Sequence, residues 1–288
     1  MRHALVFGAS GQIGSPLLDR LEQAGWRITA VSRGQHNDRP GLLWLRGDFD
    51  SVGALPREVD AIFSCGPLDH FARWYARTTI DCPRVLAFGS TSIEVKRGSA
   101  DPEERAVDAR LREGERTVFE IAAARGAQAT LLRPTLVYGA GRDHTLTRIA
   151  SLARRWGRFV LPRHACGKRQ PVHVADLADA AFASCDAPAT HGNAYALPGG
   201  ETLAYRDMVG RVLAALEPPP RLHEVPSPVF AAALLGARAL GRVGGFGDAA
   251  VARMRSDLVF DISPATRDFA YAPRPFHPTA RMFDTRAP

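Results

Sequence analysis

Three glycines follow the first apolar run of this chain and constrain its fold more than any other feature. The run 4–7 (ALVF) has the composition of a buried strand, and residues 13–24 have the apolar spacing of a helix. The segment between them reads Gly8-Ala-Ser-Gly11-Gln-Ile-Gly14. A glycine-rich turn from a strand into a helix predicts a parallel α/β fold with an anion site at the turn.

Each glycine has a separate expected role. Gly8 permits the sharp turn, Gly11 lets the backbone approach a pyrophosphate, and Gly14 allows the helix to pack close to the sheet. The first amides of the helix then face the anion. The loop therefore predicts a dinucleotide site that also includes Ser10, Gln12 and Ile13. The alternative is a tight strand-to-helix turn that holds no ligand.

Strands and helices alternate through the first two-thirds of the chain. Further strands are expected at 27–32, 42–46, 61–64, 85–88 and 129–132, and a long helix is expected over 104–125. Such alternation predicts a Rossmann-type doubly wound parallel sheet, whose ligands lie beyond the carboxyl ends of the strands. We expect residues 1–140 and 170–186 to form this domain. Residues 141–169 and 187–288 are expected to form a small substrate-binding lobe.

Several segments resemble the extended, nucleotide-sugar epimerase/dehydratase branch of the short-chain dehydrogenase/reductase superfamily. The resemblance rests on the GxxGxxG spacing and on the segments 47–49 (GDF), 132–141 (LRPTLVYGAG) and 171–178 (PVHVADLA). It implies that Asp48 and Phe49 contact the adenine. The loops after the fourth, fifth and sixth strands add further expected cofactor contacts, namely Cys65, Gly66, Ser90, Pro134 and Thr135.

The end of the second strand indicates which nicotinamide cofactor is used. Arg33 stands there, where an acidic residue would hold the ribose 2′-hydroxyl of NAD. Because an arginine accommodates a 2′-phosphate, we expect NADP, with NAD still possible. The alternative is a solvent-exposed arginine at a strand end.

The catalytic pattern of the superfamily is incomplete. Thr91 matches the hydroxyl residue that follows the fifth strand, but the Tyr and Lys that should lie four apart on one helix are absent. Their positions fall near Val107 and Leu111, and no tyrosine occurs between Tyr75 and Tyr138. Lys96 is the nearest replacement for the acid/base function, unless it is a solvated loop lysine. Otherwise the proton moves through water or substrate, or the chain binds dinucleotide without catalysis.

The charge of +7 is concentrated in one segment. No acidic residue lies between Asp143 and Asp176, whereas seven cations do. A local anion site explains this cluster of cations better than a general nucleic-acid-binding surface does. A solvated cationic helix remains the alternative. By the resemblance, the expected contacts to a substrate phosphate are Arg163, Lys168 and Arg169.

Composition narrows the kinds of metal site, compartment and partner that we expect. Four separated cysteines and no Cys/His cluster predict no metal site and favour reduced thiols in the cytoplasm. No apolar run is long enough to span a bilayer, so we expect neither a membrane nor a nucleic-acid partner. The resemblance makes a homodimer plausible.

These features together predict an NAD(P)-dependent oxidoreductase or epimerase. Its expected substrate is a sugar nucleotide or a similar small molecule with a hydroxyl or carbonyl group. The alternatives are a catalytically silent dinucleotide-binding regulator or scaffold, and a reductase of a non-sugar biosynthetic intermediate.

Overall fold

The computed structural model describes residues 1–143, 145–239 and 252–284, which form two compact units. The first unit contains Met1–Thr135, Val172–Pro198 and Phe260–Pro273. The second contains Leu136–Pro171, Gly199–Val259 and Arg274–Pro288.

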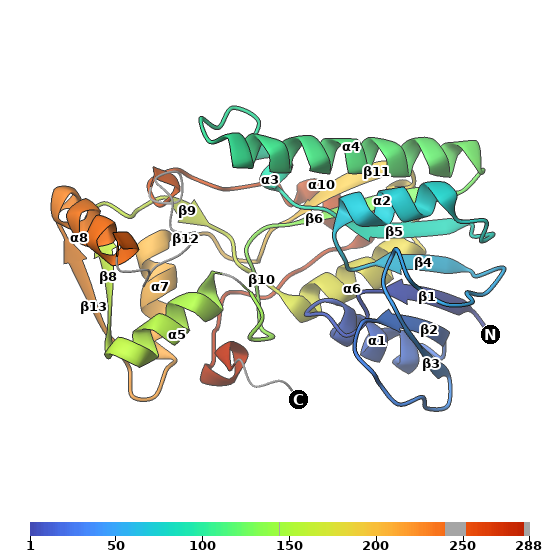
Figure 1. The fold of residues 1–288 in the computed structure, drawn as a ribbon, viewed down its shortest axis with the longest axis horizontal. Helices are drawn as coiled ribbons and strands as arrows, with labels where there is room; N and C mark the ends of the chain where they lie inside the picture. Colours follow the sequence, from blue (N-terminus) through green and yellow to red (C-terminus); the bar gives the residue numbers. More distant parts are fainter. Residues whose placement is uncertain (144, 240–251, 285–288) are drawn as a thin grey trace. The chain divides into compact units, whose positions relative to one another are not determined.

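The first unit is built on a seven-stranded sheet in which every pairing is parallel (Figure 1). The strand order is β11-β6-β5-β4-β1-β2-β3. This is the Rossmann-type arrangement that the alternating pattern predicts, and the bounds of its strands are β1 (His3–Phe7), β2 (Arg27–Ser32), β3 (Leu42–Arg46), β4 (Ala61–Ser64), β5 (Arg84–Phe88), β6 (Gln128–Pro134) and β11 (Asn193–Leu197).

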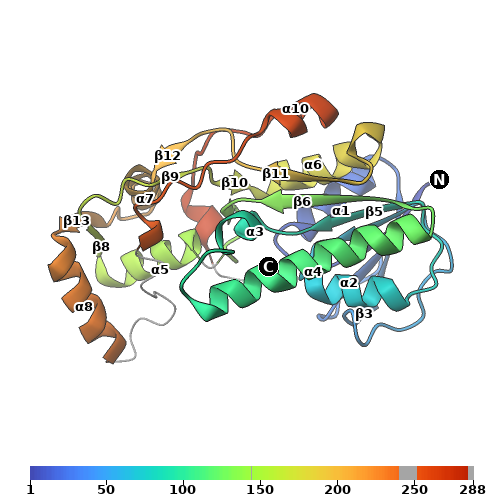
Figure 2. The ribbon, with the colours of Figure 1, turned by 90° about the horizontal axis from the view of Figure 1, so that it is seen from above.

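Helices cover both faces of this sheet (Figure 2). On one face α2 (Leu68–Arg77) packs against α4 (Pro102–Ala124), and on the other α1 (Gly14–Gln23) packs against α6 (Val174–Cys185). Burial on both faces explains why the central strands are almost wholly apolar. The core on the α2 side contains stacked rings, with the centroid of Phe7 4.8 Å from that of Phe49.

The unit boundaries differ from those we expected by a few residues at 136–140 and 170–171, and by two longer segments, 187–198 and 260–273. The two longer segments belong to the first unit by their contacts. The strand β11 extends the sheet beside β6, and α10 (Ser263–Phe269) packs against β11 and α6. The hydroxyl of Tyr195 donates a hydrogen bond of 2.7 Å to Asp268, so these distant segments stabilise each other.

The second unit has its own apolar core. This unit contains α5 (Leu146–Trp156), α7 (Tyr205–Ala214) and the parallel pair of β8 (Arg158–Pro162) and β13 (Arg221–Val225). It also contains α8 (Ser227–Ala239), the short pair β9 (Lys168–Arg169) and β12 (Leu203–Ala204), and the turn η2 (Ala280–Phe283).

Candidate functional site

The glycine loop is packed too tightly for any other residue at its three glycines. A Cβ at Gly14 would lie 2.2 Å from the carbonyl oxygen of Gly8, and one at Gly11 would lie 2.9 Å from the same atom. Gly8 has a φ of +67°, and a Cβ there would lie 2.9 Å from the carbonyl carbon of Cys65. The loop therefore has the backbone geometry that a dinucleotide phosphate site requires.

Two buried polar atoms beside this loop have no hydrogen-bond partner among the described residues. They are Oε1 of Gln12, within the loop, and Oγ of Ser64, at the end of β4 opposite Phe7. Buried polar atoms are normally satisfied, so each indicates a missing donor or water. Together with the glycine cradle, they fit a polar ligand at the carboxyl ends of β1 and β4, where the strand order reverses.

Side-chain hydrogen bonds join the glycine loop to the end of β2. Oγ of Ser10 lies 2.7 Å from Oγ of Ser32, which lies 3.1 Å from Nε2 of His36. The ring of His36 stacks on Trp44 with centroids 4.1 Å apart. Arg33, next in the chain after Ser32, is exposed. Serine, arginine and histidine donors are thus gathered where the adenosine ribose lies in Rossmann folds.

Asp48 orders the turn after β3. Its carboxylate accepts hydrogen bonds from the hydroxyl and amide of Ser51 and from the amide of Asp50. The bond from the Ser51 hydroxyl, with the backbone bonds and the nearby charge of Arg33, lowers the pKa of Asp48. The carboxylate therefore stays ionised and fixes the loop at the carboxyl end of the sheet.

Phe49 and Cys65 lie close to this loop, but the side chain of Phe49 does not face it. Phe49 is buried in the core, and a Cβ at Gly66 would lie 2.8 Å from its ring. Its ring thus supports Gly66, and only its main chain is left for a ligand. Burial raises the pKa of the Cys65 thiol to about 12, so this thiol is protonated at neutral pH.

Thr91 and Lys96 lie at the two ends of α3 (Ser92–Val95), directly after β5. The Thr91 hydroxyl donates a 3.1 Å hydrogen bond to the carbonyl of Pro134, and the Ser90 hydroxyl accepts one from the Ser92 amide. Lys96 is half-buried and forms no ion pair with another described residue. Thr135, at the end of β6, donates its amide to the carbonyl of Leu197.

Apolar residues occupy the two positions on α4 near which we expected the catalytic dyad. Leu111 packs against the core, and Val107 is half-buried. One charged pair lies next to them in the sequence. Arg112 bonds to Asp108 at 3.0 Å and donates to the carbonyl of Ile93, which ties α4 to α3. We did not foresee these contacts, because they depend on the packing of α3 against α4.

The expected phosphate contacts in the second unit have different surroundings. Arg163 and Lys168 are exposed, whereas Arg169 is buried. The guanidinium of Arg169 donates to the carbonyls of Lys168, Arg253 and Ser256. Its donors thus hold the 253–256 segment, and we withdraw Arg169 as a phosphate contact.

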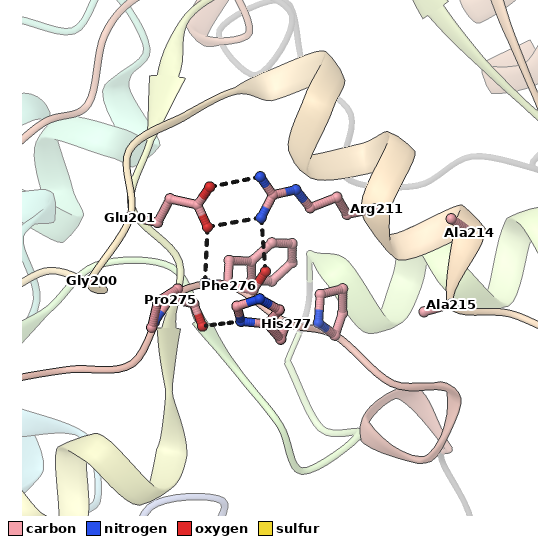
Figure 3. A pocket seen from close by; sticks show the side chains of 9 residues that line it. Gly200, Glu201, Arg211, Ala214, Ala215, Pro275, Phe276 and His277 are labelled. Carbon is pink, nitrogen blue, oxygen red and sulfur yellow. Dashed lines mark hydrogen bonds and ion pairs between the residues drawn. The ribbon is translucent and has the colours of Figure 1, made fainter.

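A surface depression of about 750 Å³ lies on the second unit (Figure 3). Glu201 and Arg211 face each other in it and form a two-point ion pair, with Nη2 2.6 Å from Oε1 and Nη1 2.8 Å from Oε2. Nη1 also donates to the carbonyl of Phe276. These charges satisfy each other, so the depression presents a closed pair and not a set of open donors.

The sheet order, the glycine cradle and the buried polar atoms beside it define a dinucleotide-binding protein of the Rossmann type. The chain matches the family model "NAD dependent epimerase/dehydratase family" over residues 4–80 and 108–197. It therefore belongs to that family.

Two curated relatives are similar to this chain at 25% identity. One is the 2-alkyl-3-oxoalkanoate reductase of Stenotrophomonas maltophilia, and the match covers 94% of both chains. The other is subunit 9 of the NADH dehydrogenase [ubiquinone] 1 alpha subcomplex of Arabidopsis thaliana, with 78% of this chain and 61% of the relative covered.

Solved structures share the fold. The UDP-glucuronic acid 4-epimerase of Bacillus cereus in complex with NAD is 12% identical, with a TM-score of 0.70 over 98% of this chain and 94% of that one. MoeE5 in complex with UDP-glucose and NAD is 17% identical, with a TM-score of 0.69 over 95% and 94%. The Rossmann-type fold and the family resemblance that we read from the motifs are confirmed.

Proposed function

We propose that this protein binds NADP(H) at the glycine loop after β1 and transfers hydride between it and a carbonyl or hydroxyl carbon of a small anionic substrate. The observation that carries the proposal is the glycine cradle, in which a Cβ at Gly14 would lie 2.2 Å from the Gly8 oxygen. The residues that would hold the cofactor are those of the loop, with Ser90, Pro134, Thr135 and the main chain of Asp48, Phe49, Cys65 and Gly66.

Donors at the end of β2 support the preference for NADP over NAD. Arg33 is exposed there, and neither Ser32 nor Arg33 offers a carboxylate to the ribose 2′-hydroxyl. Ser10, Ser32 and His36 add hydrogen-bonding groups beside it. A 2′-phosphate prefers such charge-assisted donors, whereas a carboxylate would repel it.

The active-site chemistry fits reduction without a tyrosine. A bound nicotinamide would supply or accept the hydride. Because the Thr91 hydroxyl donates its hydrogen to the Pro134 carbonyl, its oxygen can accept a hydrogen bond from a substrate hydroxyl. The ammonium of Lys96 can donate a proton to the oxygen that gains charge as the carbonyl carbon is reduced. Thr91 orients the substrate in this scheme, and Lys96 is the acid.

The substrate class follows from charge. Arg163 and Lys168 are exposed on the second unit and can bind a phosphate or carboxylate. A sugar nucleotide is the first candidate, since MoeE5 and the B. cereus epimerase were solved with UDP-glucose or UDP-glucuronic acid. A non-sugar oxo acid is the second, supported by the relative named as a 2-alkyl-3-oxoalkanoate reductase.

A silent dinucleotide-binding subunit is the alternative function. The apolar residues at Val107 and Leu111 favour it, because the dyad that lowers the tyrosine pKa in the superfamily is missing. The relative that is a subunit of NADH dehydrogenase is in accord with such a role. We further propose a cytoplasmic location and a homodimer, on the reduced thiols and the family resemblance.

Two measurements test the proposal. NADPH and NADH are titrated into the protein, and a panel of nucleotide sugars and 3-oxo acids is screened by absorbance of the reduced nicotinamide. Thr91→Val and Lys96→Met should each lower turnover at least tenfold while cofactor affinity is kept. Arg97→Ala, the exposed neighbour of Lys96, is the control. Cofactor binding with no turnover of any panel member would favour the silent subunit, and no cofactor binding would refute both.

A further inference from the structure

No crossover helix follows β3 in the first unit. The connection 47–60 between β3 and β4, every residue of which is described, forms no helix, whereas neighbouring parallel strands are usually joined through one. On the α2 side of the sheet, α2 contacts β5 and α4 contacts β6. Over the β1–β3 part of the sheet the first unit has a pocket of about 620 Å³.

This pocket lies at the amino ends of three neighbouring strands. Its lining includes the first residues of β1, β2 and β3, which are His3, Arg27 and Leu42. The register pairs His3 with Arg27 and Thr29 with Leu43, so these four side chains share one face of the sheet. The glycine loop follows the carboxyl end of β1. The pocket is therefore at the opposite end of the strands from the proposed cofactor site.

Hydrogen bonds connect three side chains that line the pocket. Nη2 of Arg27 lies 2.9 Å from Nδ1 of His3, and Nε2 of His3 lies 2.9 Å from Oγ1 of Thr29. Because Nδ1 accepts from the guanidinium, Nε2 has the ring hydrogen and donates it to Thr29. Thr29 is only 4% exposed, and its own hydroxyl hydrogen has no acceptor among the described residues. The pocket thus contains a buried hydroxyl donor.

Arg27 adds a positive charge that no described acidic side chain pairs with. Arg39 also lines the pocket, but its guanidinium forms a two-point ion pair with Glu22. The carboxylate of Asp38, a further lining residue, accepts a 2.7 Å hydrogen bond from the amide of Trp44. The remaining N–H groups of Arg27 can therefore donate to the carboxylate of a ligand.

Most of the other lining side chains are apolar. Leu43 and Leu45 come from β3, and Ala54, Leu55 and Pro56 come from the connection to β4. Leu43 is 48% exposed, so an alkyl chain laid over it would remove apolar surface from water. A largely apolar pocket of this volume with a few polar groups is typical of small-molecule sites.

We propose that this pocket binds a small amphipathic carboxylate, with its anionic head on Arg27 and Thr29 and its alkyl chain on Leu43 and Leu55. An inorganic anion would leave the leucines exposed to water, and an uncharged alkyl compound would leave the guanidinium without a counter-charge. The amphipathic anion satisfies both. The site is separate from the glycine loop, and the proposal does not depend on the proposed function.

Isothermal titration calorimetry of the full-length protein with sodium octanoate tests the proposal. We expect saturable binding of one octanoate per chain, whether or not NADPH is present. 1-Octanol has the same alkyl chain without the charge and should bind at least about tenfold more weakly, because it loses the charge-assisted hydrogen bond to Arg27. Arg27→Gln should weaken octanoate binding about tenfold for the same reason. Leu43→Asn should weaken it several-fold, because the alkyl chain loses apolar contact.

The matched controls are Arg110→Gln, on the exposed face of α4, and Leu235→Asn, which changes an exposed leucine of α8. Both should bind octanoate as the unaltered protein does. Far-ultraviolet circular dichroism establishes that each variant is folded, and Leu43→Asn, at a half-exposed position, keeps the test open if Arg27→Gln unfolds.

Four results would overturn the proposal. They are equal affinities for octanoate and 1-octanol, displacement of octanoate by NADPH, unchanged octanoate affinity in the folded pocket variants, and no saturable binding of octanoate at all.

Discussion

Arg133 and Glu115 form a two-point ion pair beside Gly89, with Nε of Arg133 2.8 Å from Oε1 of Glu115. The side chain of Glu115 is 8% exposed, and a Cβ at Gly89 would lie 3.2 Å from its Oε1. Glu94 of α3 lies 3.4 Å from the same guanidinium. The pair thus joins β6, α4 and α3, the helix that has Thr91 and Lys96 at its ends.

Glu115→Gln should destabilise the protein by about 1–3 kcal/mol, because it removes the buried counter-charge of a largely buried guanidinium and leaves it only the more distant, exposed Glu94. Urea unfolding measures the effect. Glu113→Gln is the matched control, since that carboxylate is exposed and pairs with exposed Arg116, and it should cost under about 0.5 kcal/mol. Equal effects of the two substitutions would contradict a structural role for the buried pair.

Gly14→Ala should abolish dinucleotide binding, because the new methyl group would overlap the Gly8 carbonyl and displace the loop. Gly53→Ala is the control, since a Cβ there meets nothing within 4 Å. The measurement is an NADPH titration of both folded variants. Retention of affinity in Gly14→Ala would show that the loop is not the cofactor site.

Arg84 is a buried cation whose partners are all uncharged. It donates to the carbonyls of Gln128, Ser184 and Cys185 and to the hydroxyls of Thr130 and Thr190, at 2.7–2.9 Å. Arg84→Met should cost about 3 kcal/mol or more, because several buried acceptors lose their donor. Arg84→Lys should also destabilise the fold, since an ammonium has three donors.

The free energy of unfolding measures both variants, with Arg110→Met, on the exposed face of α4, as the control. A cost under 1 kcal/mol for Arg84→Met would contradict the assignment of these five bonds.

His3 should make stability fall in mild acid. Burial, followed by the charge of Arg27, lowers the pKa of His3 below its ordinary value of 6.5. The folded protein therefore binds fewer protons than the unfolded chain once the pH falls below about 6.5. The stability that the protein has while His3 is neutral is present above pH 6.5. It is lost as the pH falls from 6.5 toward the pKa of His3 in the folded protein.

His3→Gln should reduce this slope between pH 6.5 and the lower folded pKa, because an amide does not titrate in that range. Thermal unfolding of both proteins across the window tests it. A slope that is the same in both proteins would contradict the assignment to His3.

Arg33→Asp should lower NADPH affinity by more than tenfold and leave NADH affinity unchanged or improved, since a carboxylate repels a 2′-phosphate and binds a 2′-hydroxyl. His36→Ala should weaken NADPH binding several-fold with little change for NADH. Parallel titrations with both cofactors measure this. Equal losses for the two cofactors would argue against a 2′-phosphate site at the end of β2.

The sequence predicts the sheet well, because its central strands are buried on both faces and most of its strands appear as short apolar runs. The expected strand 27–32 and strand 42–46 match β2 and β3 residue for residue. The helix α2 was missed, although Leu68, Phe71, Ala72 and Tyr75 have helical spacing and are all buried. Local periodicity would have found it.

Other features depend on contacts between distant segments. Nothing local shows that 260–273 packs on β11, or that the guanidinium of Arg169 is used by three carbonyls. Likewise, motif spacing indicates Ser10 and Arg33, but the bond from Ser10 to Ser32 requires β2 to pair beside β1, which brings the end of β2 next to the glycine loop. The expected catalytic residues Thr91 and Lys96 remain a prediction.

Binding of reduced nicotinamide cofactor by the purified protein tests the central claim most directly. Nicotinamide fluorescence is followed as the protein is added to NADPH and, separately, to NADH. The account predicts saturable binding of one NADPH per chain, tighter than NADH and lost in Gly14→Ala. Absence of saturable binding of either cofactor at millimolar concentration would contradict it.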